Sequence, residues 1–261
     1  MDQKLTRELA HEAAIAGITP GSDEYCVARF AVKDEQYRTL CILALKTIIE
    51  QIPLKVSDPG IARIKLAWWR DHATSQGHPL VKCAEQLELP LTQLLDACAS
   101  LSESLDSEYL RESFEDRPAR ERWFKSSFVD VYQLLGQETQ LAIMLEQARS
   151  LLKMREEIQA NIFRLSSDSL AKAGLEQENF VASPLSTACH EFIVSELTAA
   201  ESDLAHALTA RNRHRSPTRT YAELTLRRLQ ETIRDGGRLF ERKVDLTPIR
   251  KMLIAWRCRW L

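Results

Sequence analysis

Three glutamates are the side chains in this sequence best suited to holding a metal ion. Carboxylate oxygens are the ligands that Mg²⁺ prefers, and two carboxylates one helical turn apart can share one ion. Glu156 and Glu157 are adjacent instead, and Glu50 is the only acid between residues 46 and 56. The simpler interpretation is a salt-bridged Glu50, and a solvated, ion-paired helix face around Glu156 and Glu157.

Three basic residues in the same region indicate a different chemistry. Lys153, Arg155 and Arg164 could hold a phosphate group directly, through charge-assisted hydrogen bonds and without a metal. We treat these three residues as the candidate ligand-binding set. The histidines have neither H-x₃-H nor HExxH spacing, so the sequence predicts no histidine metal site.

Composition argues against a nucleic-acid-binding, a secreted or a membrane-spanning protein. The chain has 261 residues, a formal net charge of -2, and six scattered cysteines with no CxxC pair. This charge gives no sign of a nucleic-acid partner, and the cysteines are expected to be reduced and buried. The first residues do not resemble a secretory signal, and no apolar run reaches the roughly 18 residues that span a bilayer. We expect a cytoplasmic protein.

Apolar residues at helical spacing predict the elements that position these side chains. Two helices are predicted between Tyr37 and Pro79, broken at Pro53 and restarted at Ser57-Asp58-Pro59. The segment 123–164 reads as a long helical stretch interrupted at Gly136, and helices are also predicted at the two ends of the chain. No convincing alternating strand is present, so we predict an all-α fold in a single domain, residues 1–261. The charge-rich segment 108–122 is predicted to be solvated.

The helix pair and two later segments resemble a known family. The run DPGIARIKLAWWRDHA, followed by GHP, is similar to the E-P-x-x-G-x-I-R-L-x-W-W-R-D-x-L … H-P signature of squalene/phytoene synthases. The run FRLSSDSLAKAGLEQENF resembles the family's Y-L-P-x-D-x-L-x-x-A-G-L-x-x-E-D-F, and the last helix resembles its closing segment. The resemblance implies a single helical bundle of the isoprenoid synthase type with a central, apolar cavity.

The same resemblance implies two Asp-rich motifs, which hold Mg²⁺ and the diphosphate of a prenyl substrate. The first motif falls on Glu50-Gln51-Ile52-Pro53-Leu54 and keeps one acid, Glu50. The second places Lys153 at one metal-ligand position, with Glu156 and Glu157 as remnants. Because a cation repels a metal ion, both motifs are predicted to be broken, with no catalytic residue assigned and no cofactor expected.

We therefore expect a catalytically degenerate member of this family that serves as a binding or assembly factor. The Trp-Trp-Arg form resembles a branch containing a mitochondrial complex I assembly factor, which implies respiratory complex subunits as partners. A prenyl lipid in the cavity is a further expected partner. The alternative is an active prenyl transferase that condenses farnesyl or geranylgeranyl diphosphate, with Mg²⁺ on Glu50 and Glu157. The last helix, with Trp256 among basic residues, packs on the bundle or contacts a membrane at its inner face.

Overall fold

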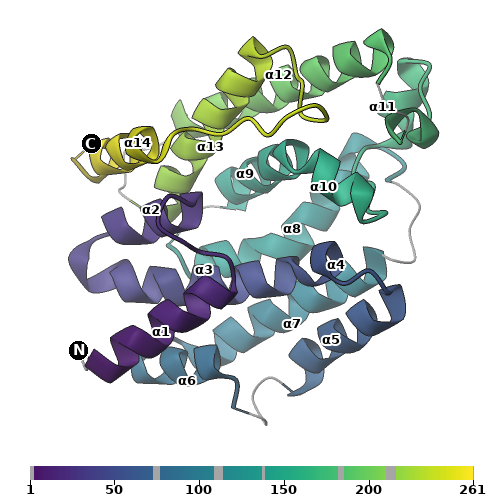
Figure 1. Cartoon of the computed structure of the whole chain (residues 1–261). Coiled ribbons are helices and arrows are strands. Elements are labelled where there is room, and N and C mark those ends of the chain that lie inside the picture. The colour runs from purple at the N-terminus through teal and green to yellow at the C-terminus, as the bar shows by residue number, and fades with distance from the viewer. Residues whose placement is uncertain are drawn as a thin grey trace.

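The computed structural model is an all-α bundle, as the sequence predicts (Figure 1). It describes residues 3–72, 77–108, 114–136, 139–181, 185–209 and 216–260, and these contain no β-strand. The α-helices are, in chain order, α1 (Gln3–Ile15), α2 (Asp23–Phe30), α3 (Gln36–Glu50), α4 (Ile52–Lys55), α5 (Pro59–His72), α6 (Pro79–Gln86), α7 (Leu91–Glu108), α8 (Arg117–Gln133), α9 (Thr139–Leu152), α10 (Met154–Gln159), α11 (Ser167–Lys172), α12 (Thr187–Thr209), α13 (Pro217–Arg234) and α14 (Pro248–Trp260). None of these helices is long and apolar enough to cross a membrane.

Local sequence explains where several helices begin and end. The Ser22 hydroxyl caps α2 by accepting a hydrogen bond from the Tyr25 amide at 3.1 Å. The Asp58 carboxylate caps α5 in the same way, and Pro59 is its first residue. Pro53 follows the end of α3 and lies in the short α4, so the predicted break is confirmed.

Two helices form the interior of the bundle. α3 is buried over most of its length, and α9 is buried from Leu141 to Leu151. α3 packs against α1, α2, α6 and α7, whereas α9 packs against α8, α12 and α13. A helix that is buried on all sides has no solvated face for its charged side chains. The charged residues of α3 and α9 must therefore be neutralised inside the protein.

The structure corrects part of the predicted solvated segment 108–122, of which residues 109–113 lie outside the described residues. Asp116 caps α8, and the helix already begins at Arg117. Within this segment Arg120 is buried and forms an ion pair with Glu196 of α12 at 3.4 Å. A buried arginine paired across two helices cannot be distinguished in sequence from a solvated one, because its partner lies 76 residues away.

The tryptophan pair and the cysteines behave as predicted. Trp69 is buried and Trp68 is half-buried, and their rings pack edge-to-face at 5.3 Å. Next to this pair, Arg70 binds Asp71 through two hydrogen bonds. All six cysteines are free thiols, five buried and Cys258 half-buried. His214 and the basic segment 211–215 lie outside the described residues.

One glycine is required where α13 turns back against α12. Gly237 has a φ of +68°, which favours glycine. A Cβ atom there would come 2.7 Å from a methyl carbon of Val194. The turn at Gly237 is followed by the C-terminal segment 239–247. This segment forms part of the wall of the cavity described below.

Candidate functional site

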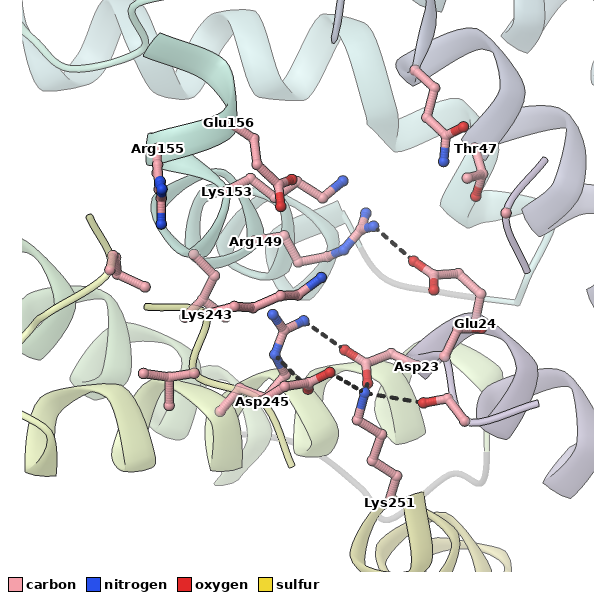
Figure 2. Close-up of a pocket in the computed structure, with 18 of the residues that line it drawn as sticks. Asp23, Glu24, Thr47, Arg149, Lys153, Arg155, Glu156, Lys243, Asp245 and Lys251 are labelled. Atoms are coloured by element: carbon pink, nitrogen blue, oxygen red, sulfur yellow. Dashed lines mark hydrogen bonds and ion pairs between the residues drawn. The ribbon is translucent and has the colours of Figure 1, made fainter. Parts of the chain in front are cut away.

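A cavity of about 600 Å³ lies between α2, the α9–α10 junction, α13 and the C-terminal segment (Figure 2). Ten charged side chains dominate its lining, so we call it the charged cavity. Its basic residues are Arg149, Lys153, Arg155, Arg228, Lys243 and Lys251, and its acidic residues are Asp23, Glu24, Glu156 and Asp245. The predicted cavity is present, but its lining is charged rather than apolar.

One wall of the charged cavity is an ionic network that holds α14. Lys251 of α14 is buried, and its ammonium group lies 2.9 Å from both Asp23 and Asp245 and donates a hydrogen bond to the Gly21 carbonyl. Arg228 of α13 donates to the other oxygen of Asp23 at 2.8 Å. This network satisfies the charges of α2, α13 and α14 where they meet (Figure 2).

Behind the opposite wall, α3 and α9 share a fully internal group of charges, Lys46, Glu50, Glu146 and Arg149, which we call the interior ion cluster. Lys46, one turn before Glu50 on α3, donates a hydrogen bond to it and lies 3.0 Å from Glu146. Arg149 donates to Glu146 at 2.6 Å and lies 3.7 Å from Glu50. Lys46 is only 2% exposed and Glu146 only 3%, so the charges of these two residues are almost completely shielded from solvent.

Aromatic groups and a further acid complete the interior ion cluster. The Tyr132 hydroxyl donates to Glu146, and the Lys46 ammonium lies 5.0 Å from the centre of the Phe128 ring. Arg149 extends from the cluster to Glu24 at 3.1 Å, at the edge of the charged cavity. Arg149 therefore connects the interior charges to the cavity lining.

The net effect of burial and neighbouring charges in the interior ion cluster is to lower the pKa values of Glu50, Glu146 and Lys46. Burial raises the pKa of Glu50, but the charges of Lys46, Lys153 and Arg149 outweigh it and hold this pKa well below its ordinary value of 4.5. The pKa of Glu146 is lowered for the same reason, by Arg149 and Lys46 against burial. Burial, followed by the charge of Arg149, lowers the pKa of Lys46.

These shifts predict an acid-sensitive fold. A carboxyl group whose pKa is lower in the folded than in the unfolded state stabilises the fold above its unfolded pKa, and this contribution is lost as the pH falls. We expect the free energy of unfolding to drop between about pH 5 and pH 3, with a shallower slope in Glu50→Gln. Urea unfolding at a series of pH values measures both slopes, and parallel slopes would contradict the assignment.

Comparison with solved structures identifies the fold of this helical bundle. A crystal structure of a dehydrosqualene synthase in complex with a ligand aligns with a TM-score of 0.68, covering 99% of this chain and 97% of that chain at 11% sequence identity. The chain has the isoprenoid synthase fold. No family model and no curated protein matches the sequence. The predicted fold class is thus confirmed.

Within this isoprenoid synthase fold, only part of the predicted ligand-binding set meets in the cavity. Lys153 and Arg155 line it, together with Glu156, from the start of α10. Arg164 does not line it: its guanidinium donates to Glu157 at 2.7 Å and lies 4.9 Å from the centre of the Trp123 ring. Arg164 therefore lies apart from Lys153 and Arg155, and its charge neutralises a buried glutamate.

Sequence reasoning missed Lys243, which lines the charged cavity from the C-terminal segment (Figure 2). Its only signal is its place in the basic run of Arg242 and Lys243. Glu157 was expected on a solvated face, yet it is 3% exposed and accepts hydrogen bonds from Ser150 and Arg164. Glu156, by contrast, is exposed as predicted.

Of the residues that the sequence resemblance implies for Mg²⁺, Glu50 and Glu157 are engaged by other side chains, and Glu156 is exposed at the charged cavity. Glu50 and Glu146 are neutralised by Lys46 and Arg149, and Glu157 is engaged by Ser150 and Arg164. Within the described residues, no group of three or more His, Cys, Asp or Glu side chains is arranged to hold a metal ion. Buried carboxylates already paired with cations offer no free oxygen pair to a divalent ion.

A second hollow, the apolar groove, lies on the other side of Gln51. It has a volume of about 360 Å³, is lined by Trp68 and Trp69, and carries Lys55 and Lys65 among its charged residues. Gln51 lines both the apolar groove and the charged cavity. The two tryptophans pack against each other and also form part of the wall of this groove.

Proposed function

We propose that the protein binds an anionic, phosphate-bearing ligand in the charged cavity directly, without Mg²⁺, and does not turn it over. The observation that carries this proposal is the position of Lys46, whose ammonium group lies between Glu50 and Glu146. A cation in that place neutralises the carboxylates that would otherwise attract a metal ion. Without the metal, the site lacks the divalent ion that would stabilise diphosphate as it departs.

The charged cavity supplies the cations for such a ligand. Arg155 and Lys243 form no ion pair with any described residue, and the only ion-pair contact of Lys153 is Glu50, at 3.8 Å. The cavity's acids, except the exposed Glu156, are paired with Arg149, Arg228 or Lys251. Arg155 and Lys243, together with Lys153 and its long contact to Glu50, enter one cavity from α10 and from the C-terminal segment, and such a set suits a phosphate group.

The test is binding of inorganic pyrophosphate and of farnesyl diphosphate in the presence of EDTA, measured by calorimetry. We expect binding of both, weakened roughly tenfold or more in Lys153→Ala/Lys243→Ala because each lost charge-assisted contact contributes about 1.5–3 kcal/mol. Lys172→Ala, which removes an exposed lysine paired with Asp168 on α11, is the matched control. Binding that requires Mg²⁺, or that the double variant leaves unchanged, would refute the proposal.

Comparing the two ligands also tests for a prenyl-lipid partner. Because Gln51 lines both hollows, a chain attached to a phosphate in the charged cavity could continue into the apolar groove beside Trp68 and Trp69. Tighter binding of farnesyl diphosphate than of pyrophosphate, with a change in tryptophan fluorescence, supports a prenyl ligand. Equal affinities and unchanged fluorescence limit recognition to the phosphate group.

The second candidate is an active prenyl transferase, and the full-length likeness to a dehydrosqualene synthase favours it. It predicts Mg²⁺-dependent release of pyrophosphate from farnesyl or geranylgeranyl diphosphate, with NADPH present, beside an active synthase control. Release that is absent in Glu50→Ala would establish catalysis and overturn the binding-only function. No release, together with EDTA-resistant binding, supports the binding protein.

The biological role that the sequence resemblance favours is assembly of respiratory complex I at a cytoplasmic membrane face. Its support is the resemblance of the Trp-Trp-Arg segment alone, since fold by itself does not determine function. The measurement is NADH oxidation by membranes from a deletion strain, complemented with the wild-type protein or with Lys153→Ala/Lys243→Ala. Normal oxidation in the deletion strain would remove this role without affecting the ligand-binding proposal.

A further inference from the structure

The C-terminal helix α14 exposes an unusual number of large apolar side chains. It contributes five of the ten large hydrophobic residues that are exposed within the described part of the chain. They are Ile249 (72% exposed), Met252 (46%), Leu253 (59%), Trp256 (54%) and Trp260 (62%). We call this set the α14 stripe. Isolated exposed apolar residues are ordinary, but five on one 13-residue helix form a patch.

The spacing of the α14 stripe places it on one face of the helix. Its members follow one another at intervals of three, one, three and four residues, which is the period of a single helical face. The opposite face carries the buried Lys251 and Ala255, which hold α14 to α2 and α13. The apolar stripe therefore faces away from the bundle, at one edge of the molecule (Figure 1).

The charges around the α14 stripe are all positive. At 100° per residue, Arg250 and Arg257 lie along one border of the stripe and Arg259 along the other, and α14 contains no acidic residue. Arg250 forms an ion pair with Glu231 at 2.6 Å, whereas Arg257 forms none with any described residue. The Arg259 guanidinium lies 5.9 Å from the centre of the Trp260 ring. Tryptophan and arginine on the borders of an apolar face are typical of helices that lie in a membrane interface.

We propose that the α14 stripe docks the protein onto the surface of an anionic lipid bilayer, with the helix lying parallel to the membrane. The apolar residues would enter the boundary between headgroups and acyl chains, and Arg257 and Arg259 would contact lipid phosphates. A second copy of the chain fits this face less well, because self-pairing would bring together two copies of Arg257, which forms no ion pair with any described residue. This inference does not rest on the ligand proposed for the charged cavity.

The structure also indicates that docking requires no unfolding. Lys251 anchors the inner side of α14 through Asp23, Asp245 and the Gly21 carbonyl, so the stripe is already held outward. A surface that is ordered before binding avoids the cost of ordering it on the membrane. Because Lys251 lines the charged cavity as well, docking would place this wall of the cavity near the lipid headgroups.

The test is co-sedimentation of the full chain with vesicles, and tryptophan fluorescence as a second readout. We expect binding to vesicles that contain phosphatidylglycerol, weaker binding at high salt, and little binding to phosphatidylcholine alone. Trp256→Ser/Trp260→Ser is expected to reduce binding roughly tenfold or more, and Arg257→Ser/Arg259→Ser several-fold. The four replaced side chains are at least partly exposed, so the fold is expected to tolerate both changes.

Ile64→Ser/Val181→Ser is the matched control, because it removes two exposed apolar residues, 70% and 74% accessible, that lie outside α14. This control is expected to bind vesicles like the wild type. Absence of vesicle binding, or equal loss in the control, would overturn the proposal. So would a concentration-dependent dimer that the Trp256→Ser/Trp260→Ser change abolishes, because the stripe would then be a self-association surface.

Discussion

Replacing Lys46 with methionine is expected to lower the free energy of unfolding by about 3–5 kcal/mol, the largest effect we predict for a single side chain. The change keeps the apolar length of the side chain and removes its charge. Glu50 and Glu146 would then share Arg149 as their closest cation, in an interior that solvent does not reach. Two buried carboxylates with insufficient compensation either remain charged at high cost or take up a proton.

The surface of the same protein offers a matched control. Lys4 and Glu8 form an ion pair with the same i, i+4 spacing on α1, but at 3.8 Å and with the lysine side chain 79% exposed. Lys4→Met is expected to change stability by no more than a few tenths of a kcal/mol, because exposed pairs contribute little. Urea unfolding of both variants at neutral pH provides the comparison. Similar losses in the two would show that burial of Lys46 is not the cause.

A double variant separates the charge from the packing. Lys46→Met/Glu50→Gln removes one cation and one anion together, so most of the stability lost in Lys46→Met is expected to return. A further loss equal to that of Glu50→Gln alone would mean that the two residues do not interact. In this double variant, Glu146 would keep its contacts with Arg149 and Tyr132.

Replacing Lys251 with methionine is expected to destabilise the fold by about 2–4 kcal/mol and to loosen α14. The ammonium group of Lys251 is the link between Asp23, Asp245 and the Gly21 carbonyl. Arg228 still compensates Asp23 at 2.8 Å, which is why the expected loss is smaller than for Lys46. Limited trypsin digestion should then cut first at the arginines of α14, and urea unfolding measures the loss.

Lys243 provides the control for this second variant. It lines the same cavity but forms no ion pair with any described residue, so Lys243→Met is expected to weaken anion binding and leave stability unchanged. Lys251→Met is expected to reduce stability whether or not a ligand is present. If both variants lost stability equally, the network at Asp23 would not be what holds α14.

The α14 stripe and the charged cavity are two surfaces of one structural unit. The inner side of α14 completes the cavity through Lys251, and its outer side carries the apolar residues. A protein that binds a phosphate-bearing ligand next to a membrane surface would obtain both properties from one short helix. The vesicle and calorimetry experiments test these properties separately, since Trp256 and Trp260 do not line the cavity.

The sequence determined the helices of this protein because helix formation depends on neighbours along the chain. Apolar spacing, Pro53 and the cap at Asp58 were enough to place α3 and α5 but not the short α4, since each signal acts within about one turn. The sequence also identified Glu50, Lys153 and Arg155 as residues of interest by their types and by resemblance. The sequence did not predict that Arg120 is buried, because neighbouring residues in the sequence do not show whether a charged side chain is buried.

Only the tertiary structure decided which charges meet. Lys46 and Glu146 are 100 positions apart in the sequence, yet packing of α3 against the rest of the bundle brings them to 3.0 Å. The same packing turned Arg164 toward Glu157 and brought Lys243 to the cavity that Lys153 lines. Electrostatic interactions depend on distance in space and on burial, and neither is encoded in local sequence spacing.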